Sequence, residues 1–107
     1  MDSNPASITD PSVEAALSTL EAGLTQVMKV RTDTLNNPDR LRVLQRIETV
    51  VRALPGHGLE LVAQIERQWN NNEFATPNVT DTIAEALHIS PGEARARWRA
   101  AQDLAHR

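Results

Sequence analysis

The chain has 107 residues, of which 40% are hydrophobic and 23% are charged, and it contains no cysteine. That length suits one domain with one hydrophobic core, and the lack of cysteine excludes a disulfide scaffold, a thiolate metal site and a cysteine nucleophile. The net charge of −3 argues against a protein that coats nucleic acid without sequence preference.

Residues 1–10 are mostly polar and are expected to form a flexible tail. They lack the basic run and apolar segment of a secretory signal. No stretch of the chain approaches the roughly 20 apolar residues of a membrane span. We therefore expect no membrane partner, and the lack of cysteine fits a cytoplasmic location.

The first helix is predicted over residues 11–30. Asp10 can accept a hydrogen bond from a free backbone N–H, and Pro11 suits the first helical position. Apolar residues then recur at steps of four and three, which is the spacing of one helix face. They are Val13, Leu17, Leu20, Leu24 and Val27.

Two further helices are predicted over residues 38–54 and 59–70. Asn37-Pro38 is typical of a helix start, with Asn37 as the cap. The segment Pro55-Gly56-His57-Gly58 is expected to break the chain between them, because proline and glycine are costly inside a helix. The residues expected to be largely buried are Leu17, Leu20, Leu24, Leu44, Ile47, Val51, Val62 and Ile65.

A polar linker is predicted over residues 71–78, followed by helices over residues 79–87 and 91–105. Ser90 and Glu93 have the spacing of a capping box, with Pro91 in the first turn. The fold class is therefore all-α, a small four- to five-helix bundle in a single domain over residues 11–107. Its three-helix part would cover residues 11–70, and residues 79–107 would form a helix-turn-helix-like hairpin.

The segment from Ile83 to Ala94 carries the clearest functional indication. A helix-turn-helix needs small residues where its helices cross, as at Ala84 and Ala94, and a turn residue that tolerates a left-handed backbone, as His88 does. This pattern resembles the helix-turn-helix of many bacterial regulators. An ordinary helical hairpin that closes the bundle remains the alternative, because bundles reuse such hairpins without contacting DNA.

A recognition helix over residues 91–105 would enter the major groove by its N-terminal end. The helical period turns Arg95 and Arg99 outward, and arginine can read guanine edges or bind phosphates. The inward-facing residues would be Ala94, Trp98 and Ala101. The candidate DNA-binding residues are Ser90, Gly92, Arg95 and Arg99.

Several segments carry a family resemblance. Those after Thr82 are Ile83-Ala84-Glu85-Ala86-Leu87, Ile89-Ser90, Glu93-Ala94-Arg95 and Ala100-Ala101 to Leu104. The upstream ones are Asn37-Pro38-Asp39-Arg40-Leu41 and Arg46 to Leu54-Pro55. Together they resemble the 13E12-repeat family of actinobacteria (domain of unknown function 222), from roughly residue 20 onward. The resemblance implies the N-terminal helical region of longer proteins, many of which end in an HNH nuclease domain, and hence a fragment, a truncated relative or a stand-alone regulator.

No catalytic constellation is visible. The histidines His57, His88 and His106 are far apart in sequence and are expected in turns or near the end, so we expect no metal site. The carboxylates are expected on solvated helix faces or at caps, and no glycine-rich loop follows a strand. We expect no cofactor, no small-molecule substrate and no enzymatic activity.

Two functional hypotheses follow. The first is a non-catalytic helical DNA-binding or DNA-targeting module, either regulatory or the N-terminal part of a nuclease-associated protein, with double-stranded DNA as its partner. The alternative is a protein-interaction or homodimerisation module that uses the apolar faces of the first three predicted helices.

Overall fold

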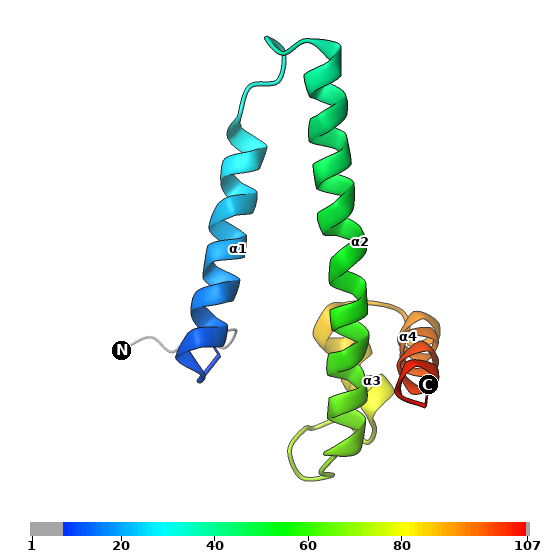
Figure 1. Cartoon of the computed structure of the whole chain (residues 1–107). Helices are drawn as coiled ribbons and strands as arrows, with labels where there is room; N and C mark the ends of the chain where they lie inside the picture. The colour runs from blue at the N-terminus through cyan, green and yellow to red at the C-terminus, as the bar shows by residue number, and fades with distance from the viewer. Residues whose placement is uncertain (1–7, 107) are drawn as a thin grey trace. The chain divides into compact units, whose positions relative to one another are not determined.

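The computed structural model describes residues 8–106, and within that range the chain is all-helical, as expected. Its helices are α1 (Pro11–Lys29), α2 (Asn37–Arg67), α3 (Val79–Leu87) and α4 (Pro91–Ala105) (Figure 1). No helix among the described residues is long and apolar enough to span a membrane. Most of the tail predicted over residues 1–10 lies outside the described residues.

The chain divides into two units, residues 1–40 and residues 41–107. In the first unit, α1 begins where the sequence predicts. The Asp10 carboxylate accepts the backbone N–H groups of Ser12 and Val13 at 2.9 and 3.2 Å and the Ser12 hydroxyl at 2.7 Å. The hydroxyl bond, followed by the two backbone bonds, lowers the pKa of the Asp10 carboxyl. The cap therefore stays ionised, which suits the positive end of a helix.

The start of α2 is held by a different asparagine from the one predicted. The Asn36 side chain, not that of Asn37, accepts the backbone N–H of Asp39 at 2.8 Å. The Asn37 side chain instead accepts a bond from Arg40 at 2.9 Å. Arg40 also donates to the Thr32 carbonyl at 3.2 Å, so the first turn of α2 is tied to the preceding loop.

The predicted break at Pro55-Gly56-His57-Gly58 is wrong. A single helix, α2, runs from Asn37 to Arg67 with Pro55 inside it. Proline has a helical φ, so its cost is one lost hydrogen bond and a contact with the carbonyl four residues earlier. Neither Gly56 nor Gly58 takes the left-handed conformation that would end a helix. The predicted three-helix part, residues 11–70, therefore contains two helices.

The buried core lies in the second unit, where α3 and α4 pack beside the C-terminal half of α2 (Figure 1). Its buried side chains are Val62, Ala63, Val79, Ile83, Ala94 and Ala101. Around them lie the partly buried Leu59, Trp69, Ala84, Ile89 and Trp98. Two alanines at this contact let the helices approach closely, which suits small residues on α4.

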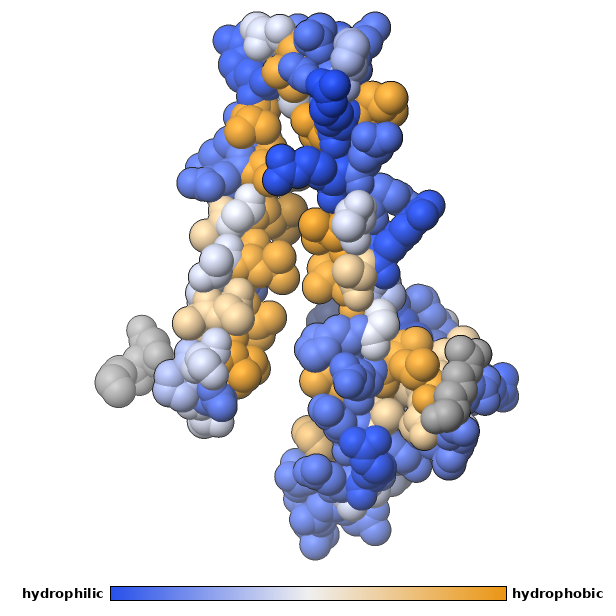
Figure 2. All heavy atoms as spheres, in the orientation of Figure 1, coloured by the Kyte–Doolittle hydropathy of each residue, from blue (hydrophilic) through white to orange (hydrophobic). Residues whose placement is uncertain are grey.

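The predicted core is largely wrong, because only Val62 among its members is buried. The other seven are 39–64% exposed: Leu17, Leu20, Leu24, Leu44, Ile47, Val51 and Ile65. Figure 2 shows apolar side chains at the surface of α1 and, separately, of α2. An apolar stripe shows which face of a helix avoids water, but it does not identify the element that covers it.

Residues 68–78 connect α2 to α3. The Trp69 indole N–H donates to the Asn71 side chain at 2.8 Å, and its ring stacks on Phe74 with the ring centres 5.6 Å apart. The hydroxyls of Thr76 and Thr82 are hydrogen-bonded. The two Trp69 contacts lie within the connection, and the Thr76–Thr82 bond joins it to the first turn of α3.

Candidate functional site

The turn between α3 and α4 is built on His88, as the sequence predicts. Its backbone is left-handed, with φ 56° and ψ 44°. The Ile89 N–H donates to the Ala84 carbonyl at 3.0 Å, and the His88 N–H donates to the Glu85 carbonyl at 3.4 Å. This paired arrangement is the Schellman motif, which satisfies the last carbonyls of a helix. Ile89 then packs against the core, which fixes the direction in which the chain enters α4.

The start of α4 also follows the sequence. The Ser90 hydroxyl accepts the Glu93 N–H at 3.1 Å, and Pro91 occupies the first helical turn. The Glu93 carboxylate bonds to Arg97 at 2.9 Å, one turn further along the helix. Ser90 therefore acts as the helix cap, which is a structural role for a residue that was expected to contact DNA.

The two faces of α4 are separated as the helical period predicts. Ala94 and Ala101 are fully buried and Trp98 is half-buried, so this side of the helix is fixed against the core. Arg95 and Arg99 are exposed. Within residues 8–106 neither forms an ion pair, whereas Arg97, on the other side of α4, pairs with Glu93. Two uncompensated positive charges are thus held one turn apart on a rigid helix.

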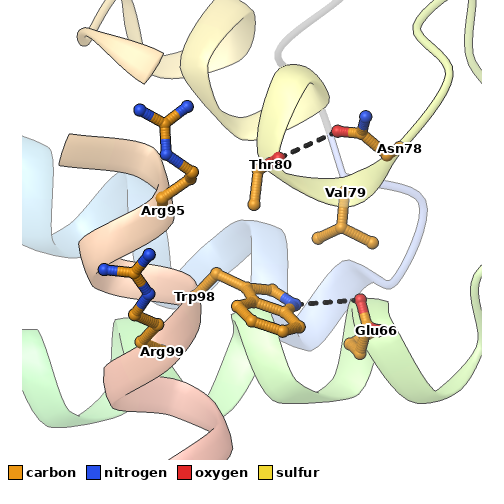
Figure 3. A pocket seen from close by; sticks show the side chains of 7 residues that line it. All are labelled: Glu66, Asn78, Val79, Thr80, Arg95, Trp98 and Arg99. Atoms are coloured by element: carbon orange, nitrogen blue, oxygen red, sulfur yellow. Dashed lines mark hydrogen bonds between the residues drawn. The ribbon is translucent and has the colours of Figure 1, made fainter. Parts of the chain in front are cut away.

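Arg95 and Arg99 border an open hollow of about 330 Å³ in the second unit (Figure 3). The hollow is lined by residues from three helices and one cap: Glu66, Asn78, Val79, Thr80, Arg95, Trp98 and Arg99. Figure 3 shows the arginines extending from adjacent turns of α4 on one side and Glu66 on the other, with the Trp98 indole between them. We refer to these seven residues as the α3–α4 hollow.

The N-terminus of α3 forms part of this hollow. The Asn78 side chain caps the helix by accepting the Asp81 N–H at 2.8 Å, and it also accepts the Thr80 hydroxyl at 2.9 Å. The free N–H groups of a helix start carry partial positive charge. At α3, however, Asn78 already accepts one of these N–H groups and Asp81 places a carboxylate in the first turn, so the positive charge that lines the hollow comes from Arg95 and Arg99.

Of the four predicted site residues, three lie together at the start of α4. A side-chain carbon built on Gly92 would lie 3.9 Å from both the Arg95 guanidinium and the Ser90 hydroxyl. Arg99 lies one turn further along and, with Arg95, lines the hollow, whereas Ser90 and Gly92 do not.

The sequence interpretation missed Glu66, Asn78 and Thr80. Asn78 could have been found, because asparagine directly before a predicted helix is a cap signal. Nothing in the sequence indicates that Glu66 lies close to α4, since the two are joined by packing between distant segments. Among the described residues, no three histidine, aspartate or glutamate side chains converge as a metal site would require.

Comparison with known proteins gives a family and several relatives. Residues 41–107 match the family described as Domain of unknown function (DUF222). An uncharacterized protein of Mycobacterium tuberculosis (strain ATCC 25618 / H37Rv) is 37% identical over 93 residues, which are 87% of this chain and 20% of that protein. An uncharacterized protein of Mycobacterium bovis is 34% identical over 95 residues, 89% of this chain and 21% of that protein. No solved structure matches. The chain thus spans about a fifth of the length of these relatives.

Proposed function

The chain belongs to the DUF222 family, the 13E12-repeat family that its sequence resembles, and we propose that it is a non-catalytic DNA-binding or DNA-targeting module. In this proposal α3 and α4 act as a helix-turn-helix, α4 is the recognition helix, and the partner is double-stranded DNA in the cytoplasm. The module is either regulatory or the N-terminal part of a nuclease-associated protein. No catalytic step, cofactor or small-molecule substrate is assigned to this chain.

The observation that carries the proposal is the pair Arg95 and Arg99. Exposed arginines contribute little to the stability of a domain, so a fold gains little from holding two of them unpaired on one helix face. Their guanidinium groups suit guanine edges or backbone phosphates. The buried Ala94 and Ala101 fix the rotation of α4, so that the arginine face stays turned outward.

The net charge of −3 limits this function to a small patch. A protein with this net charge gains little from long-range attraction to DNA. Each phosphate contact that it makes adds about −0.9 to the slope of log affinity against log salt concentration. Two arginine contacts per chain would give a slope near −2. Unless the chain dimerises, we therefore expect weak binding whose affinity falls roughly tenfold between 50 and 200 mM salt.

The test compares the parent with Arg95→Ala, Arg99→Ala and the double variant in DNA titrations at two salt concentrations. Each single change should weaken binding by about 1–3 kcal/mol if the arginine reads a base, and by less, independently of sequence, if it contacts a phosphate. Folding should be unchanged, because both side chains are exposed.

Arg97→Ala is the matched control, because it removes the same charge from the opposite side of α4, where Arg97 pairs with Glu93. It should leave DNA affinity close to that of the parent. A parent that binds no DNA at low salt, or a double Arg95/Arg99 variant that binds as well as the parent, would remove the DNA-binding proposal.

A second candidate function is favoured by the exposed apolar faces of α1 and α2. Large aliphatic side chains line these faces, among them Leu20 at 45% exposure and Leu44 at 64%. Contiguous exposed apolar surface is typical of protein–protein contacts. A protein-interaction or homodimerisation module is therefore the alternative, and it would give Arg95 and Arg99 no role.

A further inference from the structure

Glu66 connects α2 to α4 through a single hydrogen bond. The Trp98 indole N–H donates to the Glu66 carboxylate at 3.1 Å, and both side chains are half-buried. An indole N–H is a donor only and needs an acceptor when it is buried. A neutral amide oxygen can also accept this bond, although less strongly than a carboxylate does, so the bond alone does not require a charge at this position.

The charge of Glu66 is placed where it affects a bound anion. The carboxylate lies on the side of the α3–α4 hollow opposite Arg95 and Arg99 (Figure 3). No ion pair is formed by Glu66, Arg95 or Arg99 within the described part of the chain. The Glu66 carboxylate is therefore not held in a direct ion pair, and an anion inside the hollow would be within a Debye length of it.

We propose that Glu66 is a specificity-determining residue that excludes phosphate from the α3–α4 hollow. The carboxylate repels an anion that would otherwise bind inside the hollow against the two arginines. Phosphates can then bind Arg95 and Arg99 only from the outer face of α4, at the edge of the hollow. Glu66 thus lowers sequence-independent affinity for nucleic acid. This inference rests on the proposed DNA-binding function.

The test is Glu66→Gln, which keeps the shape and the acceptor oxygen and removes the charge. Affinity for DNA of unrelated sequence should rise about 2- to 10-fold at low salt, as expected for removing one charge near a bound phosphate. The gain should shrink as salt is added, because the charge is then screened. Glu60→Gln is the matched control. Glu60 lies on α2 outside the hollow, is exposed, and contacts His57 at 3.3 Å, so the net charge changes equally.

Two structural measurements separate charge from packing. Glu66→Gln should keep the tryptophan fluorescence and the melting temperature of the parent, because Trp98 keeps its acceptor. Glu66→Ala should lower the melting temperature, since the half-buried indole N–H loses its partner. A purely structural role predicts that Glu66→Gln also leaves DNA affinity unchanged, and this result would overturn the proposal.

A second probe works without DNA. Tripolyphosphate can be titrated while the Trp98 indole N–H signal is followed by NMR, in the parent, Glu66→Gln and Glu60→Gln. Tighter binding by Glu66→Gln alone supports the role of Glu66, whatever DNA does. Equal binding by all three forms rejects it. A parent that binds no DNA, together with tighter tripolyphosphate binding by Glu66→Gln, would reject DNA binding but retain the charge effect.

Discussion

At the scale of single residues, the geometry of the α3–α4 pair depends on His88. A left-handed backbone costs an ordinary L-residue roughly 1–2 kcal/mol, and His88 accepts this conformation at φ 56°. In return, two carbonyls at the end of α3 are satisfied and Ile89 reaches the core. The backbone of His88 therefore sets the direction of α4 relative to α3, and with it the position of Arg95.

The corresponding prediction compares His88→Gly with His88→Val. Glycine adopts the left-handed conformation without strain, so His88→Gly should leave stability within about 0.5 kcal/mol of the parent or raise it. Valine is branched at Cβ and should lose about 1–2 kcal/mol. Thermal unfolding should show a gap of several degrees between the two variants. Equal melting temperatures would mean that the left-handed turn is not needed for the fold.

At the scale of elements, α2 is the largest departure from the sequence prediction. Before Pro55, the apolar positions Leu44, Val51 and Leu54 follow the three–four spacing of one helix face. The same spacing continues in phase to Leu61 and Ile65. A true break would have reset this phase, so its continuity across the proline was the signal that favoured one helix. The sequence prediction gave more weight to the local cost of proline and glycine inside a helix than to this continuous apolar spacing.

A helix through residues 55–58 predicts that replacing its glycines stabilises the protein. A side chain added at Gly56 or Gly58 would meet no atom within 4 Å, and neither residue has a positive φ. Gly58→Ala should therefore gain roughly 0.5–1 kcal/mol, because alanine loses less backbone entropy in a helix. Urea unfolding followed by the helical circular dichroism signal measures this gain. A loss of stability instead would indicate a non-helical backbone at Gly58.

At the scale of the whole molecule, the buried core is small and much apolar surface stays exposed. Each half-exposed aliphatic side chain would contribute roughly 1 kcal/mol if a partner covered it. Both faces in question, on α1 and on α2, keep helical spacing over several turns. A second copy of the chain or another protein could cover them, and the second candidate function depends on this surface.

Native mass measurements over a range of concentrations test this candidate. A homodimer should form increasingly as concentration rises, and Leu20→Glu should shift it to monomer. Gln26→Glu adds the same charge on the opposite side of α1 and is the control. The helical circular dichroism signal should stay unchanged in both variants, because both replaced side chains are exposed. A monomer at every concentration would exclude homodimerisation.

The sequence by itself determined the features that depend on neighbours within a few residues. The all-α class, the bounds of α3 and α4, the caps at Asp10 and Ser90 and the left-handed turn at His88 all follow from local hydrogen bonding and helical spacing. The helical period alone places Ala94 on the buried side of α4 and Arg95 on its exposed side. These interactions have the same form in any fold that contains the segment.

Only the tertiary structure decided where the core lies and what surrounds the arginines. The sequence stripes marked Leu20 and Leu44 as apolar, but which face is buried depends on the partner that packs against it, and the core formed where α3 and α4 meet α2. Glu66 lies 32 residues from Trp98 in the chain, and only packing brings them into hydrogen-bond contact. The α3–α4 hollow follows from that packing, because its charges come from segments that no local rule connects.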